Sequence, residues 1–253
     1  MELKNYLSGW KKLLYEGQEA DLGLSPKVSE LYRGFVRDHY REILGKVYTR
    51  LDECHPCPWD EWAQGYFREY PPYAWELNHL ARHFPDYLEK NRLVSEDLVD
   101  LARYEWGEYV VYSHRGSPKA WAERGRGGQG DPLYILNEAH VLLELRFDIA
   151  GWIFHWEREN GFAPLRGRPS PKSNILVIAR DEKTGNCVMT LCDIFHVALY
   201  EALSTGPSEG QNERTFHLAV QKILGERVRF TKSEFREKIA FLEKQSIFYR
   251  RTP

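Results

Sequence analysis

The stretch SNILVIARDEKTGNCVMTL, residues 173–191, predicts a β-hairpin. Its first arm, residues 175–180, is apolar and rich in β-branched side chains, and its second arm, residues 187–191, alternates. The residues DEKTGN between the arms are typical of a turn. Because the first arm is apolar on both faces, we expect the last helices to cover one face. The preceding apolar segment or a partner protein would cover the other.

Helical patterns surround this hairpin on both sides. The segment 140–156 fits either a helix or strands, although the alternation of Leu143, Leu145 and Phe147 favours extended structure. The closing residues SIFYRR predict a final strand. The spacing of apolar residues predicts helices at 3–15, 28–51, 59–70, 73–90, 95–110, 193–203, 213–224 and 232–244.

The order of these elements predicts an α+β protein with two domains. Residues 1–113 read as an all-α helical bundle, and residues 114–131 form a Gly/Arg-rich linker without an apolar period. Residues 132–253 then combine a small sheet with helices. A hairpin beside three short helices is the shape of a winged helix or of a small peptide-recognition element, and the fold alone does not choose between them.

Composition narrows the class of function. The chain has 35 basic and 37 acidic residues, whereas nucleic-acid binders usually have a basic excess, so nucleic acid is disfavoured as a partner. No apolar run is long enough for a membrane span and no signal peptide is apparent, so we expect a cytoplasmic protein. Eight Trp and fifteen Tyr indicate either an aromatic core or a large partner surface.

Few side chains point to chemistry within this chain. Cys54 and Cys57 lie in a C-x-x-C pair, but Cys187 and Cys192 lack the spacing of a zinc finger or ribbon. On a helix, His79 and His83 would lie four residues apart without the Glu of an H-E-x-x-H motif. No P-loop, G-x-S-x-G or dinucleotide fingerprint occurs. We therefore expect no catalytic residue, no metal ligand and no cofactor in this chain.

Ordered motifs along most of the chain carry a resemblance to a known family. They are Tyr32-Arg33; Trp59 and Trp62; Pro72, Leu77, Leu80, Phe84 and Leu88; Tyr104-Glu105-Trp106; Leu136, Asn137 and Ala139; and the hairpin from Leu176 to Val188. In this order they resemble the bacterial family once labelled "putative DNA-binding domain", which includes the HvfC/BufC-type proteins. The segment CHPCPWDEW replaces the Gly-rich turn that is usual in that family.

The resemblance implies a partner subunit without a catalytic site of its own. Such proteins pair with multinuclear non-haem iron-dependent oxidative enzymes, which are TIM barrels that hold the iron. The pair modifies a cysteine or another residue of a ribosomally made precursor peptide, as in methanobactin- and thiaglutamate-type pathways. The partner protein would hold the precursor, including its leader, and complete the enzyme as a heterodimer.

Two sets of residues carry this expectation. An edge of the small sheet would bind the peptide as an added strand, because main-chain hydrogen bonds hold a disordered peptide without demanding much sequence. The predicted peptide-binding residues are Ile175, Leu176, Val177, Ile178, Ala179 and Arg180. The predicted enzyme-facing residues are Tyr104, Trp106, Trp152 and Trp156.

Two other functions remain open from the residues alone. A winged-helix transcriptional regulator would use the locally basic stretch KILGERVRFTKSEFREK, residues 222–238, on duplex DNA. A stand-alone metalloenzyme would use His79, His83 and the cysteines.

Overall fold

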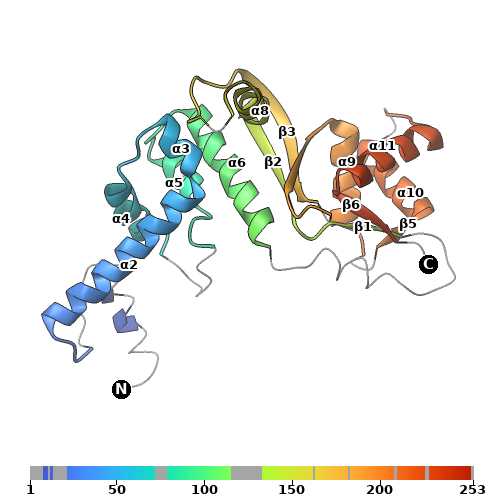
Figure 1. Cartoon of the computed structure of the whole chain (residues 1–253). Helices are drawn as coiled ribbons and strands as arrows, with labels where there is room; N and C mark the ends of the chain where they lie inside the picture. The colour runs from blue at the N-terminus through green and yellow to red at the C-terminus, as the bar shows by residue number, and fades with distance from the viewer. Residues whose placement is uncertain are drawn as a thin grey trace. The chain divides into compact units, whose positions relative to one another are not determined.

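The computed structural model confirms an α+β protein (Figure 1). It describes residues 8–10, 12–13, 22–71, 79–114, 133–161, 163–181, 183–207, 210–225 and 228–251. The chain divides into two compact units, Met1–Trp106 with Ile153–Arg168, and Gly107–Trp152 with Pro169–Pro253. The predicted linker lies outside the described residues except for His114, so the predicted domain limits stay a prediction. None of the described helices is long and apolar enough to cross a membrane.

The first unit is helical throughout its described part. Ser25 caps the first long helix, where its hydroxyl accepts the Val28 amide, and Pro26 occupies the first helical position. The described helices are α2 (Pro26–Val47), α3 (Thr49–Cys54), α4 (Trp59–Glu69), α5 (Phe84–Lys90), the beginning of α6 (Glu96–Ser113) and most of α8 (Ile149–Asn160).

The predicted helix 28–51 breaks at Tyr48, and two buried polar groups explain the break. The Tyr48 hydroxyl donates to the carbonyl of Ala81 at 2.6 Å. The carboxylate of Glu105, which is almost fully buried, accepts the amides of Arg50 at 2.7 Å and Leu51 at 3.1 Å. These amides belong to the first turn of α3, so an acidic side chain distant in sequence caps this new helix.

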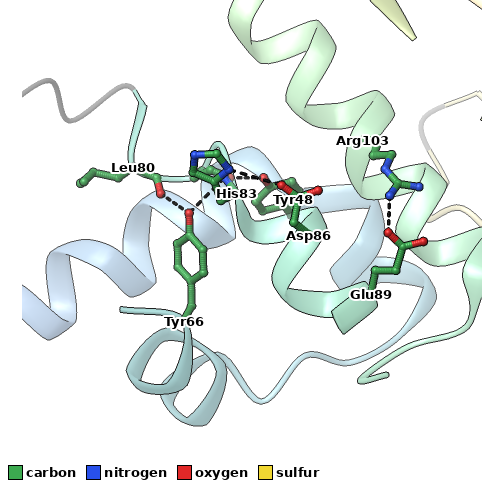
Figure 2. Close-up of polar contacts among 8 residues, drawn as sticks. Tyr48, Tyr66, Leu80, His83, Asp86, Glu89 and Arg103 are labelled. Carbon is green, nitrogen blue, oxygen red and sulfur yellow. Dashed lines mark hydrogen bonds and ion pairs between the residues drawn. The ribbon is translucent and has the colours of Figure 1, made fainter. Parts of the chain in front are cut away.

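The predicted helix 73–90 is shorter than the apolar spacing indicated. Residues 72–78 lie outside the described part, residues 79–83 form a turn, and α5 begins at Phe84. Figure 2 shows how the Tyr66 hydroxyl holds this turn: it donates to the Leu80 carbonyl at 2.6 Å and accepts the His83 amide at 3.2 Å. Tertiary hydrogen bonds therefore replace the helical bonds that the local sequence would otherwise form.

The described part of the second unit contains two antiparallel sheets. One sheet has the order β2-β3-β4, with β2 (His140–Phe147), β3 (Pro171–Arg180) and β4 (Cys187–Cys192), which confirms the predicted hairpin. The other has the order β5-β1-β6, with β5 (Gln211–Asn212), β1 (Leu133–Leu136) and β6 (Phe248–Arg251). The ambiguous segment 140–156 contains both a strand, β2, and most of a helix, α8.

Three helices pack with these strands around one core. They are α9 (Ile194–Ser204), α10 (Glu213–Leu224) and α11 (Lys232–Lys244), which follow the predicted ranges closely. Asp193 and Thr231 form capping boxes at the starts of α9 and α11. Buried side chains of the three helices form one core with side chains of strands β1, β3 and β6. The hairpin does not pair with the final strand, so the two lie in different sheets of this unit.

The two faces of β3 have different covers. Val177 and Ala179 belong to the core formed with α9, α10 and α11, as expected for the first face. The second face meets the C-terminal part of α6 at Gly107. A Cβ atom there would lie 3.0 Å from Cδ1 of Leu143, 3.1 Å from Cγ1 of Val141 and 3.2 Å from Cδ1 of Ile178. The second cover is therefore a helix of this chain, and not the preceding apolar segment.

Asn137 joins the two sheets. Its side chain is fully buried, and Nδ2 donates to the carbonyls of Arg180 at 3.0 Å and Ser246 at 2.7 Å. Its Oδ1 accepts the Ala139 amide at 2.9 Å, and its own amide donates to Ile247 at 2.9 Å. One side chain thus satisfies main-chain groups at the ends of β3 and α11 and at the start of β2.

We expect Gly107→Leu to lower the free energy of unfolding by about 1–3 kcal/mol, because the side chain would overpack a filled interface. Gly34→Leu is the matched control, since a Cβ at Gly34 meets nothing within 4 Å and a helical Gly is itself unfavourable. Chemical denaturation measures both variants. Equal effects at the two positions would contradict the close packing at Gly107.

We expect Asn137→Ala to cost about 3 kcal/mol or more, because it removes a fully buried side chain that bonds three main-chain groups. The exposed Asn186 in the hairpin turn offers a control, and Asn186→Ala should change stability by about 0.5 kcal/mol or less. Thermal unfolding followed by circular dichroism separates the two outcomes. A loss below about 1 kcal/mol for Asn137→Ala would argue against its role as the junction.

Candidate functional site

The predicted peptide-binding segment is the middle strand of its sheet. Residues 175–180 of β3 pair with β4 on one side, and residues 174–179 pair with β2 on the other. A peptide strand cannot add to main-chain groups that already pair on both sides, so these residues do not form the open edge. An added strand must pair with β2 or β4, and peptide binding by this sheet stays a prediction.

The hydrogen bonds of β3 show which groups of β4 face outward. The Asp181 amide donates to the Asn186 carbonyl at 2.8 Å, which marks a hydrogen-bonded pair at the hairpin turn. Such pairs alternate along an antiparallel ladder. Val188, Thr190 and Cys192 therefore bond β3, whereas the main-chain groups of Cys187, Met189 and Leu191 point away from it. On the other side of β3, the Arg180 amide donates to the carbonyl of Ala139, directly before β2, at 3.0 Å, as this alternation requires.

Charge distinguishes β4 from the other edge strands of the described sheets. Strand β2 carries Glu144 and Arg146, β6 carries Arg250 and Arg251, and β5 is only two residues long. Charges and short length protect an edge against pairing with other strands. Strand β4, with the sequence CVMTLC, has neither a charged residue nor a proline. Within the described part of the chain, β4 has a strand neighbour only on its β3 side.

The outward side of β4, here called the β4 edge, also exposes apolar side chains. Leu191 is 50% exposed and Met189 is 39% exposed, and Ile194 just beyond the strand is 68% exposed. Their cross-strand neighbours Leu176 and Ile178 are buried. The apolar face that α6 covers near Gly107 thus continues to an exposed margin at β4.

The ends of β4 carry no reactive group. Burial raises the pKa of the Cys187 and Cys192 thiols to about 11, so both are protonated at neutral pH. Beyond Cys192, Asp193 accepts the Lys238 ammonium at 2.7 Å and the His196 amide at 2.9 Å. Burial works to raise the pKa of Asp193, but these bonds outweigh it and lower that pKa. Neither cysteine of β4 is therefore activated as a thiolate nucleophile.

The four predicted partner-interface residues differ in exposure. Tyr104 is fully buried, with 0% exposed, which leaves none of its surface to a partner. Trp106, Trp152 and Trp156 are half-buried, and the Trp156 indole donates to the Ala163 carbonyl at 3.0 Å. Their part in an enzyme interface stays a prediction.

The residues proposed for a metalloenzyme are not arranged for metal binding. His79 and His83 lie in a turn and not on a helix, and His83 contacts Asp86 at 3.3 Å (Figure 2). Burial raises the pKa of Cys54 to about 11 and that of Cys57 still further. In the described ranges, no group of three or more His, Cys, Asp or Glu could hold a metal ion.

The helix-turn-helix formed by α10 and α11 shows mixed charge. Arg236 of α11 places two nitrogens on Glu213 at 2.9 and 2.7 Å, and Lys238 pairs with Asp193. Three glutamates lie among the basic residues of α11. Such a surface lacks the basic excess that neutralises phosphates, which weighs against duplex DNA as a ligand.

One histidine of the second unit has a defined protonation state. His140 Nδ1 contacts the Asn137 carbonyl, which can only accept, so Nδ1 carries the proton. Nε2 then accepts the Tyr200 hydroxyl at 2.8 Å. Burial lowers the pKa of His140 below its ordinary value near 6.5. This neutral imidazole links the start of β2 to α9.

Together these features define the class of protein: an α+β protein with a helix-covered antiparallel sheet and an uncharged edge strand. Comparison with known proteins adds no family to this class, since no family model and no curated protein matches the chain. Sequence reasoning predicted the hairpin but assigned the peptide to its first arm, which lies in the middle of the sheet, and did not name Leu191 of the edge strand β4. The available signal was the absence of charge and proline from CVMTLC.

We expect acid to destabilise the second unit through His140. Because burial lowers its folded-state pKa, the unfolded chain binds more protons below about pH 6.5. The stabilisation is complete above that pH and is lost as the pH falls through it towards the folded-state pKa. His140→Gln should reduce this slope, which is at most about 1.4 kcal/mol per pH unit for one proton. His196, whose pKa burial also lowers, retains part of the slope. Chemical denaturation at a series of pH values measures this dependence. Identical dependence of the free energy of unfolding on pH in the wild type and His140→Gln would contradict the role given to His140.

Proposed function

We propose that this protein binds an extended precursor peptide as an added strand along the β4 edge. The single observation that supports this proposal is an edge strand without charge or proline in a protein whose other described edges are charged or very short. An extended peptide supplies the main-chain donors and acceptors that such an edge can pair with.

The proposed partner is an iron-dependent oxidative enzyme to which the bound peptide is presented. This part rests on the family resemblance of the ordered motifs, and the iron belongs to the partner enzyme.

The peptide proposal depends on main-chain groups, so proline is the most direct probe. Leu191→Pro removes an amide that points away from β3 and so leaves the β3–β4 ladder intact. We expect affinity for a fluorescein-labelled precursor peptide to fall about tenfold or more. Fluorescence anisotropy measures it. Leu191→Ala is the matched control, because it trims the side chain and keeps the amide.

Two results would count against the proposal. Unchanged affinity for the precursor peptide in a folded Leu191→Pro variant would rule out the binding of the peptide as an added strand at β4. Failure of the wild-type chain to promote modification of the precursor by the barrel enzyme, followed by mass spectrometry, would remove the presenting role. Duplex DNA binding with a steep salt dependence would instead favour a regulator.

A further inference from the structure

We propose that the outer side of helix α10 binds an acidic, apolar segment of a partner protein. The surface consists of Arg214, Leu218 and Lys222 and is here called the α10 stripe. Leu218 would supply the apolar contact, and the two basic side chains would pair with carboxylates on either side of it. The inference goes beyond the proposed function and does not rest on strand addition at β4.

The α10 stripe lies opposite the buried side of its helix. Residues four apart lie along one side of a helix, so Arg214, Leu218 and Lys222 form one row. Phe216 and Val220 are fully buried on the other side, in the core with α9 and α11. Leu218 is 59% exposed, and both basic residues are exposed as well. The stripe is therefore the part of α10 that the fold of this unit leaves open to a partner.

The positive charge of the stripe is not neutralised within the described structure. In the ranges that the structure describes, neither Arg214 nor Lys222 has a carboxylate partner. Glu213, which directly precedes Arg214, instead accepts two nitrogens of Arg236 at 2.9 and 2.7 Å. Charge complementarity therefore favours an acidic partner over a neutral or basic one.

Hydrogen bonds hold the segment after α10 against the end of this helix. Gln221 Nε2 donates to the carbonyls of Gly225 at 3.0 Å and Val228 at 3.1 Å. Phe230 packs against the His217 ring of α10, with 4.9 Å between the ring centroids. Val228, which is 37% exposed, thus adds apolar surface beside the last turn of α10. A surface that is already held in place loses less conformational entropy when a partner binds.

The spacing of the stripe indicates which segment would fit it. The Cα atoms of Arg214 and Lys222 lie about 12 Å apart, because a helix rises about 1.5 Å per residue. In an extended segment, residues i, i+2 and i+4 point to the same side and span about 13 Å. Acidic side chains at i and i+4 with an apolar side chain at i+2 therefore match the stripe. A nucleic-acid backbone would meet the charges but would not bury Leu218, so the apolar contact favours a peptide.

The test titrates the 15N-labelled full-length chain with a synthetic Gly/Ser peptide that carries Glu, Leu and Glu at positions i, i+2 and i+4. We expect chemical-shift changes in the amides of α10. Arg214→Gln and Lys222→Gln should each weaken binding about threefold, and Leu218→Ser about fivefold. Lys244→Gln, at an exposed residue of α11, and Leu31→Ser, at a residue of α2 that is 58% exposed, are matched controls and should leave the affinity unchanged.

Three results would overturn the inference. The first is the absence of shift changes in α10 at millimolar peptide. The second is equal binding of a peptide with Gln in place of both Glu residues. The third is a short DNA duplex that binds α10 more tightly than the acidic peptide does, which would assign the stripe to nucleic acid. All three readouts lie on α10 and not on β4, so their failure is distinguishable from failure of the proposed function.

Discussion

The buried amide of Asn137 is the interaction on which the arrangement of the second unit depends. It satisfies the carbonyls of Arg180 and Ser246 and the amide of Ala139, which belong to three separate segments. Ser246 has a φ of 56°, and its position ends α11 in a left-handed turn that leads into β6. Because the Asn137 side chain is fully buried, an arrangement of the two sheets that separates these groups would leave its amide without hydrogen-bond partners.

This junction has a consequence for the candidate site. With the end of β3 held at Asn137, β3 lies between β2 and β4, and its two faces meet α6 and the three-helix core. A strand that is covered on both faces and paired on both edges contributes stability and cannot bind a peptide. The margin of the sheet differs, because β4 combines outward main-chain groups with half-exposed apolar side chains.

Buried polar groups play a comparable part in the helical unit. Glu105 caps α3, and the hydroxyls of Tyr48 and Tyr66 hold the turn before α5 (Figure 2). These contacts join residues that are 14 to 55 positions apart. Trp62 and Tyr66 also pack against Phe84 within the core. These aromatic residues are therefore structural.

The sequence by itself determined the α+β class, the hairpin, and the limits of α10 and α11 to the residue. These follow from local periodicity, capping residues and turn chemistry, which act within a few positions. Only the tertiary structure decided where the helix at Tyr48 breaks, which segment covers the second face of β3, and which strand forms the edge. Those outcomes depend on contacts between distant residues, such as Glu105 with Arg50 and Gly107 with Leu143. The periodicity of a strand indicates which of its faces are apolar, but its position in the sheet depends on which other strands pair with it.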